Sequence, residues 1–202
     1  MLKFMEMSHE QALAHRDAYM AALPRLVQRL QEQVAGTGGP RLDGSVDSLR
    51  QLGPWFVARL DADTDDTDDG FDESPLWWDV QQPLPDRDPI TDRPTRYLSP
   101  RQLRLVDEVA AYLGTVLQTA VPQARWIVYR QKSRGRARDI NHHATMLQGP
   151  WAHGSAEVDP VGIVYGQALA QHMYQRGQDP DLLHDFALSV VGTGPGGGPG
   201  GH

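Results

Sequence analysis

Apolar residues return at intervals of three and four through the first part of the chain, which is the spacing of one face of an α-helix. We predict that this helix begins after Ser8, the expected N-cap, and buries a stripe over residues 19–34. Pro24 lies inside the stripe and lacks the N–H group of an ordinary helical residue. We therefore expect either a kink at Pro24 or a second helix that starts after Leu23.

The same spacing predicts two further helices. One runs over residues 45–60, with a break expected at Gly53 and Pro54. The clearest helix follows Ser99, because Gln102 stands where the second half of a capping box belongs. Its expected buried face consists of Leu103, Val106, Ala110, Leu113 and Leu117.

The second half of the chain adds β-favouring residues to this helical pattern. Residues 124–131 ("ARWIVYRQ") predict a strand, and residues 143–149 are a weaker candidate for its antiparallel partner. Asp-Pro pairs at 159 and 179 open two more helices, which Gly177 and Gly192 are expected to end.

The predicted fold is therefore α+β, mostly helical, with a small two- or three-stranded antiparallel sheet around residues 125–148 that the helices cover on one side. We expect a single globular domain over residues 1–191, with an acidic loop over residues 61–79 within it. Residues 192–202 are rich in Gly and Pro and predict a flexible tail.

Composition limits the compartment and the partners. The chain has 202 residues, a formal net charge of -7 and no cysteine, which excludes disulfides, thiolate nucleophiles and cysteine-ligated metal sites. The acidic balance argues against nucleic acid and anionic membranes as partners. Glu6 and Glu10 interrupt the apolar run that a signal peptide needs, and no stretch is apolar enough to span a bilayer. We therefore expect a cytoplasmic protein.

A row of five cations alternates with other residues in "RQKSRGRAR" and is a candidate partner-binding surface. In an extended strand this spacing would put all five charges on one face, but a glycine inside the row favours a turn. A charged hairpin tip, binding of an acidic protein surface and binding of nucleic acid are the three interpretations, in that order. The row consists of Arg130, Lys132, Arg134, Arg136 and Arg138.

An acidic run precedes a pair of tryptophans. Residues 61–73 hold eight carboxylates, which could pair with the basic row or leave both segments to an external partner. A calcium loop aligned on Gly70 would have Leu76 at its twelfth position, where bidentate Glu is needed, so we predict no specific calcium site. Trp77 and Trp78 either anchor the end of this loop in the core or offer a docking surface, and they join the partner-binding candidates.

The histidine and serine patterns name no catalytic residue. His142 and His143 are adjacent, so in an extended segment they would face opposite ways and could not chelate one ion. His172 and His184 lie on different predicted helices. The chain contains no HExxH, GxSxG or phosphate-loop motif. We therefore predict no metal, no cofactor and no catalytic site.

Three segments carry a resemblance to known proteins: "LDGSVDSLRQLGPWFVARL", "VDEVAAYLGTVLQTAVPQARWIVY" and "EVDPVGIVYGQALAQHMYQRG". Together they cover most of residues 42–177. The chain resembles actinobacterial proteins of uncharacterised families, in which a helix ending in a YLG-type segment leads to a Trp-containing strand. The resemblance implies a small cytoplasmic domain with no assigned chemistry, of a kind suspected to neutralise toxins.

These observations predict a non-catalytic cytoplasmic interaction protein, an immunity-like or regulatory partner of another protein with an acidic surface. The alternative is an enzyme or a small-ligand-binding protein whose polar groups converge only in three dimensions. Arg130, Asn141, His142 and His143 are the groups named for such a site. A pocket lined by several of them would favour the alternative.

Overall fold

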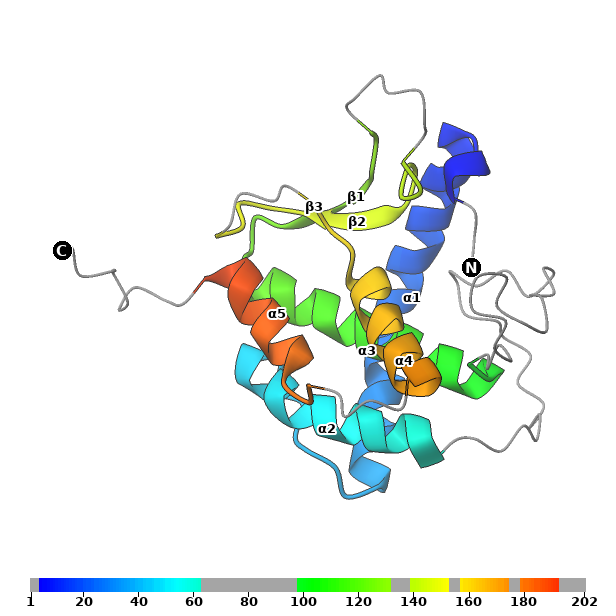
Figure 1. Ribbon diagram of the computed structural model, residues 1–202. Helices are drawn as coiled ribbons and strands as arrows, with labels where there is room; N and C mark the ends of the chain where they lie inside the picture. Colours follow the sequence, from blue (N-terminus) through cyan, green and yellow to red (C-terminus); the bar gives the residue numbers. More distant parts are fainter. Residues whose placement is uncertain (1–3, 63–97, 132–138, 153–156, 175–178, 193–202) are drawn as a thin grey trace.

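The fold is α+β, mostly helical, with a small antiparallel sheet. It is given by a computed structural model that describes residues 4–62, 98–131, 139–152, 157–174 and 179–192. A short 3-10 helix, η1 (Phe4–Glu6), opens the described chain. The elements that follow are α1 (His9–Gly36), α2 (Val46–Ala62), α3 (Pro100–Ala120), β1 (Arg125–Val128), β2 (Thr145–Gln148), β3 (Glu157–Val158), α4 (Pro160–Tyr174) and α5 (Leu182–Val191) (Figure 1).

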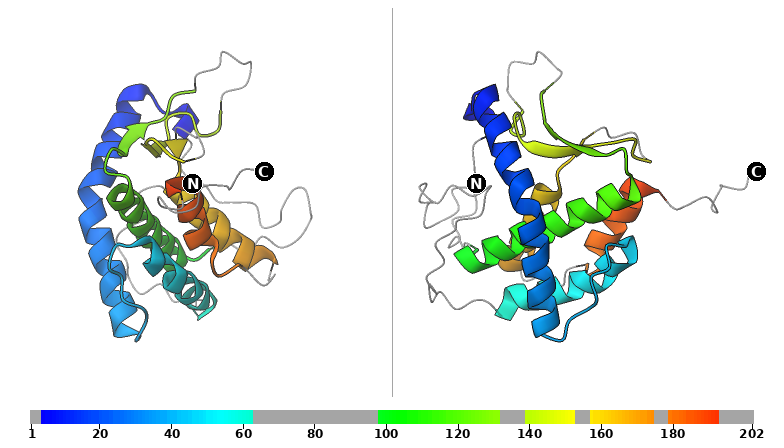
Figure 2. Two further views of the ribbon diagram at one scale, coloured as in Figure 1. Left: turned by 90° about the vertical axis from the view of Figure 1, so that its left-hand side faces the viewer. Right: turned by 180° about the vertical axis from the view of Figure 1, so that it is seen from behind.

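Helix α3 lies at the centre of the fold. It contacts both α1 and α4, and Figure 2 shows it between them. The predicted inward face is confirmed, because its five residues from Leu103 to Leu117 are each at most 2% exposed. The charged residues Arg104, Asp107 and Glu108 are buried as well. An apolar period reveals only one face of a helix, whereas helices pack on α3 from more than one side.

The predicted helix ends are confirmed where local chemistry determines them. The Ser8 hydroxyl accepts from the Gln11 N–H at 3.1 Å, and the Gln11 side chain accepts from the Ser8 N–H at 2.8 Å. Ser99 and Gln102 form the same reciprocal capping box at the start of α3. Gly192 ends α5 with a φ of 87°, a conformation that glycine adopts without steric cost.

The second helix expected after Leu23 and the helix break expected at Gly53 and Pro54 are wrong. Helix α1 continues through Pro24 as one element, and α2 continues through Gly53 and Pro54. Gly53 serves packing, because a Cβ at this position would collide with the carbonyl oxygen of Pro180. Buried residues on both sides of each proline hold the helix together despite the lost hydrogen bond.

The sheet is an antiparallel meander in the order β1-β2-β3, as Figure 1 shows across one end of the helices. Trp126 of β1 lies opposite Leu147 of β2, and Leu147 lies opposite Val158 of β3. Both predicted strands are confirmed. The third strand, β3, has only two residues, which is too short for an alternating pattern to predict it from the sequence.

The YLG segment and the tryptophan strand of the noted resemblance meet in the core. A Cβ on Gly114 would lie 2.6 Å from the Trp126 ring, so the absence of a side chain makes room for the indole. The Trp126 indole N–H donates to the Gln118 side chain at 3.0 Å. This glycine therefore fixes the distance between α3 and β1.

Several predictions concern segments outside the described residues. These are most of the acidic loop, the tail beyond Gly192, and the helix end expected at Gly177. Among the helices that are described, none combines the length and the apolar character needed to cross a bilayer.

Candidate functional site

A cavity of about 220 Å³ lies where the N-terminal segment, the start of β2 and the start of α4 come together. Its walls are largely apolar and aromatic, with a few polar groups, which is the usual make-up of a small-molecule site. The walls come from residues that are far apart in the sequence. They are Phe4, His15, Tyr19, Asn141, Ala144, Thr145, Asp159, Val161, Gly162 and Tyr165.

Tyr19 of α1 is a wall residue whose hydroxyl group is buried. The residue is 2% exposed, and its oxygen makes no hydrogen bond within the part of the chain that the structure describes. Its ring packs edge-on against Trp126 at 5.3 Å, which fixes its position. Burial, and then the charges of Asp107 and Asp159, raise the pKa of Tyr19 well above its usual value, so the hydroxyl stays protonated. Buried tyrosine hydroxyls normally have a hydrogen-bond partner.

Asp159 brings a carboxyl group to the cavity wall, directly before α4. Its Oδ1 accepts from the Gly162 N–H at 2.9 Å, as a residue at a helix start often does. A Cβ on Gly162 would lie 2.5 Å from Asp159 Oδ2, so glycine gives the carboxyl group its room. Burial raises the pKa of Asp159 and outweighs the backbone hydrogen bonds that lower it.

The remaining polar wall groups connect α1 with β2. His15 Nδ1 and Thr145 Oγ1 are 3.4 Å apart, and the Phe4 ring packs edge-on against the His15 ring at 5.2 Å. Tyr165 of α4 lies partly buried, and burial raises the pKa of its hydroxyl. The cavity can therefore offer a carboxyl group and aromatic side chains to one small ligand.

The partner-binding residues predicted from the sequence lie almost entirely outside the described residues. Arg130 follows β1 and is exposed. The rest of the basic row, residues 132–138, is not described, and the same holds for Trp77 and Trp78. Binding of an acidic partner at these residues stays a prediction.

The histidine pair does not adopt the extended geometry expected from the sequence. His142 and His143 lie in a turn, where His143 has a φ of 73° and the centroids of the two rings are 4.0 Å apart, with the ring planes tilted by 35°. The Gln131 N–H donates to His142 Nδ1 at 3.1 Å, and His143 Nδ1 donates to the Met7 carbonyl at 2.8 Å. These hydrogen bonds attach the turn to the residues after β1 and to the N-terminal segment. Of the groups named for a three-dimensional site, Asn141 alone lines the cavity described above.

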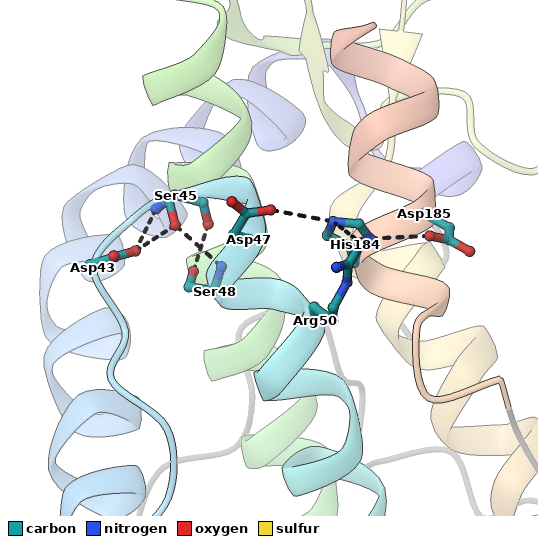
Figure 3. Close-up of polar contacts among 7 residues, drawn as sticks. All are labelled: Asp43, Ser45, Asp47, Ser48, Arg50, His184 and Asp185. Carbon is teal, nitrogen blue, oxygen red and sulfur yellow. Dashed lines mark hydrogen bonds and ion pairs between the residues drawn. The ribbon is translucent and has the colours of Figure 1, made fainter. Parts of the chain in front are cut away.

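A second polar cluster surrounds His184, where α5 meets the first turns of α2 (Figure 3). Arg50 Nη2 lies 3.3 Å from His184 Nε2, and His184 Nδ1 lies 3.1 Å from Asp185 Oδ1. Because arginine only donates, the imidazole accepts at Nε2 and carries its proton on Nδ1, from which it donates to Asp185. Asp47 approaches Nε2 at 3.7 Å.

This cluster lacks the geometry of a serine nucleophile activated by histidine. The Ser48 hydroxyl donates to the Ser45 carbonyl at 2.6 Å and therefore accepts from the Tyr112 hydroxyl at 2.7 Å. Asp43 in turn accepts from the Ser45 hydroxyl at 2.6 Å, so these groups order the start of α2 (Figure 3). The His184 cluster is therefore a polar contact between helices. Among the described residues, no group of three or more His, Asp or Glu is placed to hold a metal ion.

The cavity could not be predicted from the sequence, because the sequence position of each wall residue is already explained by the helix or strand to which it belongs. Tyr19 belongs to the apolar stripe of α1, and Asp159 opens α4. No local pattern shows that they face the same space. No protein-family model, curated protein or solved structure matches this chain, so the fold and the cavity are the observations on which a functional proposal rests.

Proposed function

We propose that this protein binds a small molecule in the cavity between α1, β2 and α4. The observation that carries the proposal is the cavity itself, whose largely apolar walls include aromatic rings and a few polar residues. Asp159 and Tyr165 are the wall residues that can supply polar contacts to a ligand.

The size of the cavity sets the scale of the ligand. A cavity of roughly 150 Å³ can hold benzene, so about 220 Å³ suits a molecule somewhat larger than a single aromatic ring. This size excludes nucleotides and peptides from complete burial in the cavity. Binding of metabolites of this size is the function that the geometry supports best.

A fragment screen with a blocking variant tests the proposal. At about 100 times its Kd, a ligand adds about 2.7 kcal/mol of stability, and the melting temperature should rise accordingly. Val161→Phe should abolish the rise, because the ring fills the cavity from the start of α4. Val46→Phe is the matched control, since Val46 is likewise partly buried but does not line the cavity. Fragments that stabilise the Val161→Phe variant as well as the parent, or no stabilising fragment at all, would refute the proposal.

A further inference from the structure

The cavity walls combine one carboxyl group with several aromatic rings and no arginine or lysine among the described lining residues. The carboxyl group belongs to Asp159, and the rings belong to Phe4, Tyr19 and Tyr165. His15 is the remaining wall residue that can carry charge near neutral pH. The wall therefore combines one acidic side chain with aromatic side chains.

Resting on the proposed function, we infer that the ligand is a small organic amine. Its ammonium group would bind beside Asp159, and its apolar body would lie against the aromatic residues of the wall. An ammonium group donates up to three hydrogen bonds. The Asp159 carboxylate, which lies in the cavity wall, can accept one of them. A cation over tyrosine or phenylalanine rings is further attracted by the negative π face.

The surroundings of Asp159 favour this class over neutral or anionic ligands. A partly buried carboxylate loses hydration, and the N–H groups of Gly162 and Val161 replace only part of it. Burial accordingly raises the pKa of Asp159, and its charged form gains from further compensation. A bound cation provides that compensation, whereas a bound carboxylate would add a second negative charge to the same space.

Three probes of nearly equal size test the inference: benzylamine, benzyl alcohol and benzoate. Their affinities for the full chain are measured by titration calorimetry or ligand-observed NMR at pH 7. We expect benzylamine to bind at least tenfold more tightly than benzyl alcohol, and benzoate to bind most weakly. This comparison uses the unmodified protein and so does not depend on the folding of any variant.

Asp159→Asn then locates the preference. Asparagine is as good as aspartate before a helix, so α4 should keep its start. We expect benzylamine affinity to fall at least tenfold, to the level of benzyl alcohol, while benzyl alcohol affinity stays unchanged. Asp181→Asn is the matched control, because Asp181 precedes α5 and does not line the cavity. It should leave all three affinities unchanged.

The outcomes separate this inference from the proposed function. If benzyl alcohol or benzoate binds as tightly as benzylamine, or if Asp159→Asn spares benzylamine binding, the amine inference is wrong and the cavity remains a binding site. If none of the three probes binds, the amine inference is also wrong. The fragment screen with Val161→Phe then decides independently whether the cavity binds other small molecules.

Discussion

Glu108 is a buried carboxyl group whose titration should make the stability of the protein depend on pH. Its side chain is fully buried, and it accepts from the Gln33 amide at 2.7 Å and pairs with Arg29 at 3.0 Å. Burial nevertheless outweighs the attraction of Arg29 and Arg104 and raises the pKa of Glu108 from 4.5 to about 7. The folded protein therefore holds a proton on Glu108 at pH values where the unfolded chain has released it.

The sign and size of the effect follow from these two pKa values. Because the folded form binds the proton more tightly, the contribution of Glu108 to stability is fully present below pH 4.5 and is lost as the pH rises to about 7. At roughly 1.4 kcal/mol for each pH unit between the two values, the loss amounts to about 3 kcal/mol. In a domain of this size it corresponds to a melting temperature lower by roughly 6–12 °C.

Glu108→Gln removes the titration and keeps the shape of the side chain. We expect the melting temperature of the variant, relative to the parent, to rise by roughly 6–12 °C between pH 4.5 and pH 8. Arg29 tolerates the loss of its partner because its side chain is 26% exposed. Thermal unfolding of both proteins across this range measures the difference.

The reasoning would be refuted by the opposite trend. If Glu108→Gln loses stability relative to the parent as the pH rises, the ion pair with Arg29 stabilises the charged form more than burial opposes it. The pKa of Glu108 would then lie below its usual value in the folded protein.

Three further predictions test other features of the structure. Tyr19→Phe should leave the melting temperature unchanged or raise it, because the variant removes a buried hydroxyl that has no hydrogen-bond partner among the described residues. A variant that is less stable than the parent by about 1 kcal/mol or more would reveal a partner for this hydroxyl. Gly53→Ala should lower the free energy of unfolding in urea by about 2 kcal/mol, because the new Cβ collides with the Pro180 carbonyl. Gly166→Ala has open space around its Cβ and should raise the free energy of unfolding by up to about 1 kcal/mol, so equal effects of the two substitutions would contradict the close contact at Gly53. Deletion of residues 193–202 should leave the melting temperature unchanged, and a decrease of several degrees would show that the tail docks on the domain.

Local chemistry made most of the helices predictable from the sequence. The capping boxes at Ser8 and Ser99 each need only residues three positions apart, and the apolar stripes need only the helical period. The strand at Trp126 followed from its run of β-favouring residues. The sequence therefore predicted the fold class and the inward faces of the long helices.

The errors arose where a distant segment decides the local structure. Gly53 was interpreted as a helix break, whereas its role is the contact with Pro180, more than a hundred positions away. The positive φ of His143 turns the histidine pair out of the extended geometry that the sequence suggested. The cavity was unpredictable for the same reason, because Tyr19 and Asp159 come together only after α1, β2 and α4 have packed.

The wide sequence separation of the cavity walls determines how a bound ligand would protect the chain. Phe4 and Tyr165 line the same cavity, with Thr145 of β2 between them in the sequence. Any opening that parts these segments must first release the ligand. Saturating ligand should therefore slow amide hydrogen exchange in α1, β2 and α4 together, including amides far from the cavity that exchange only through such openings. A single loop site would protect only the residues beside it.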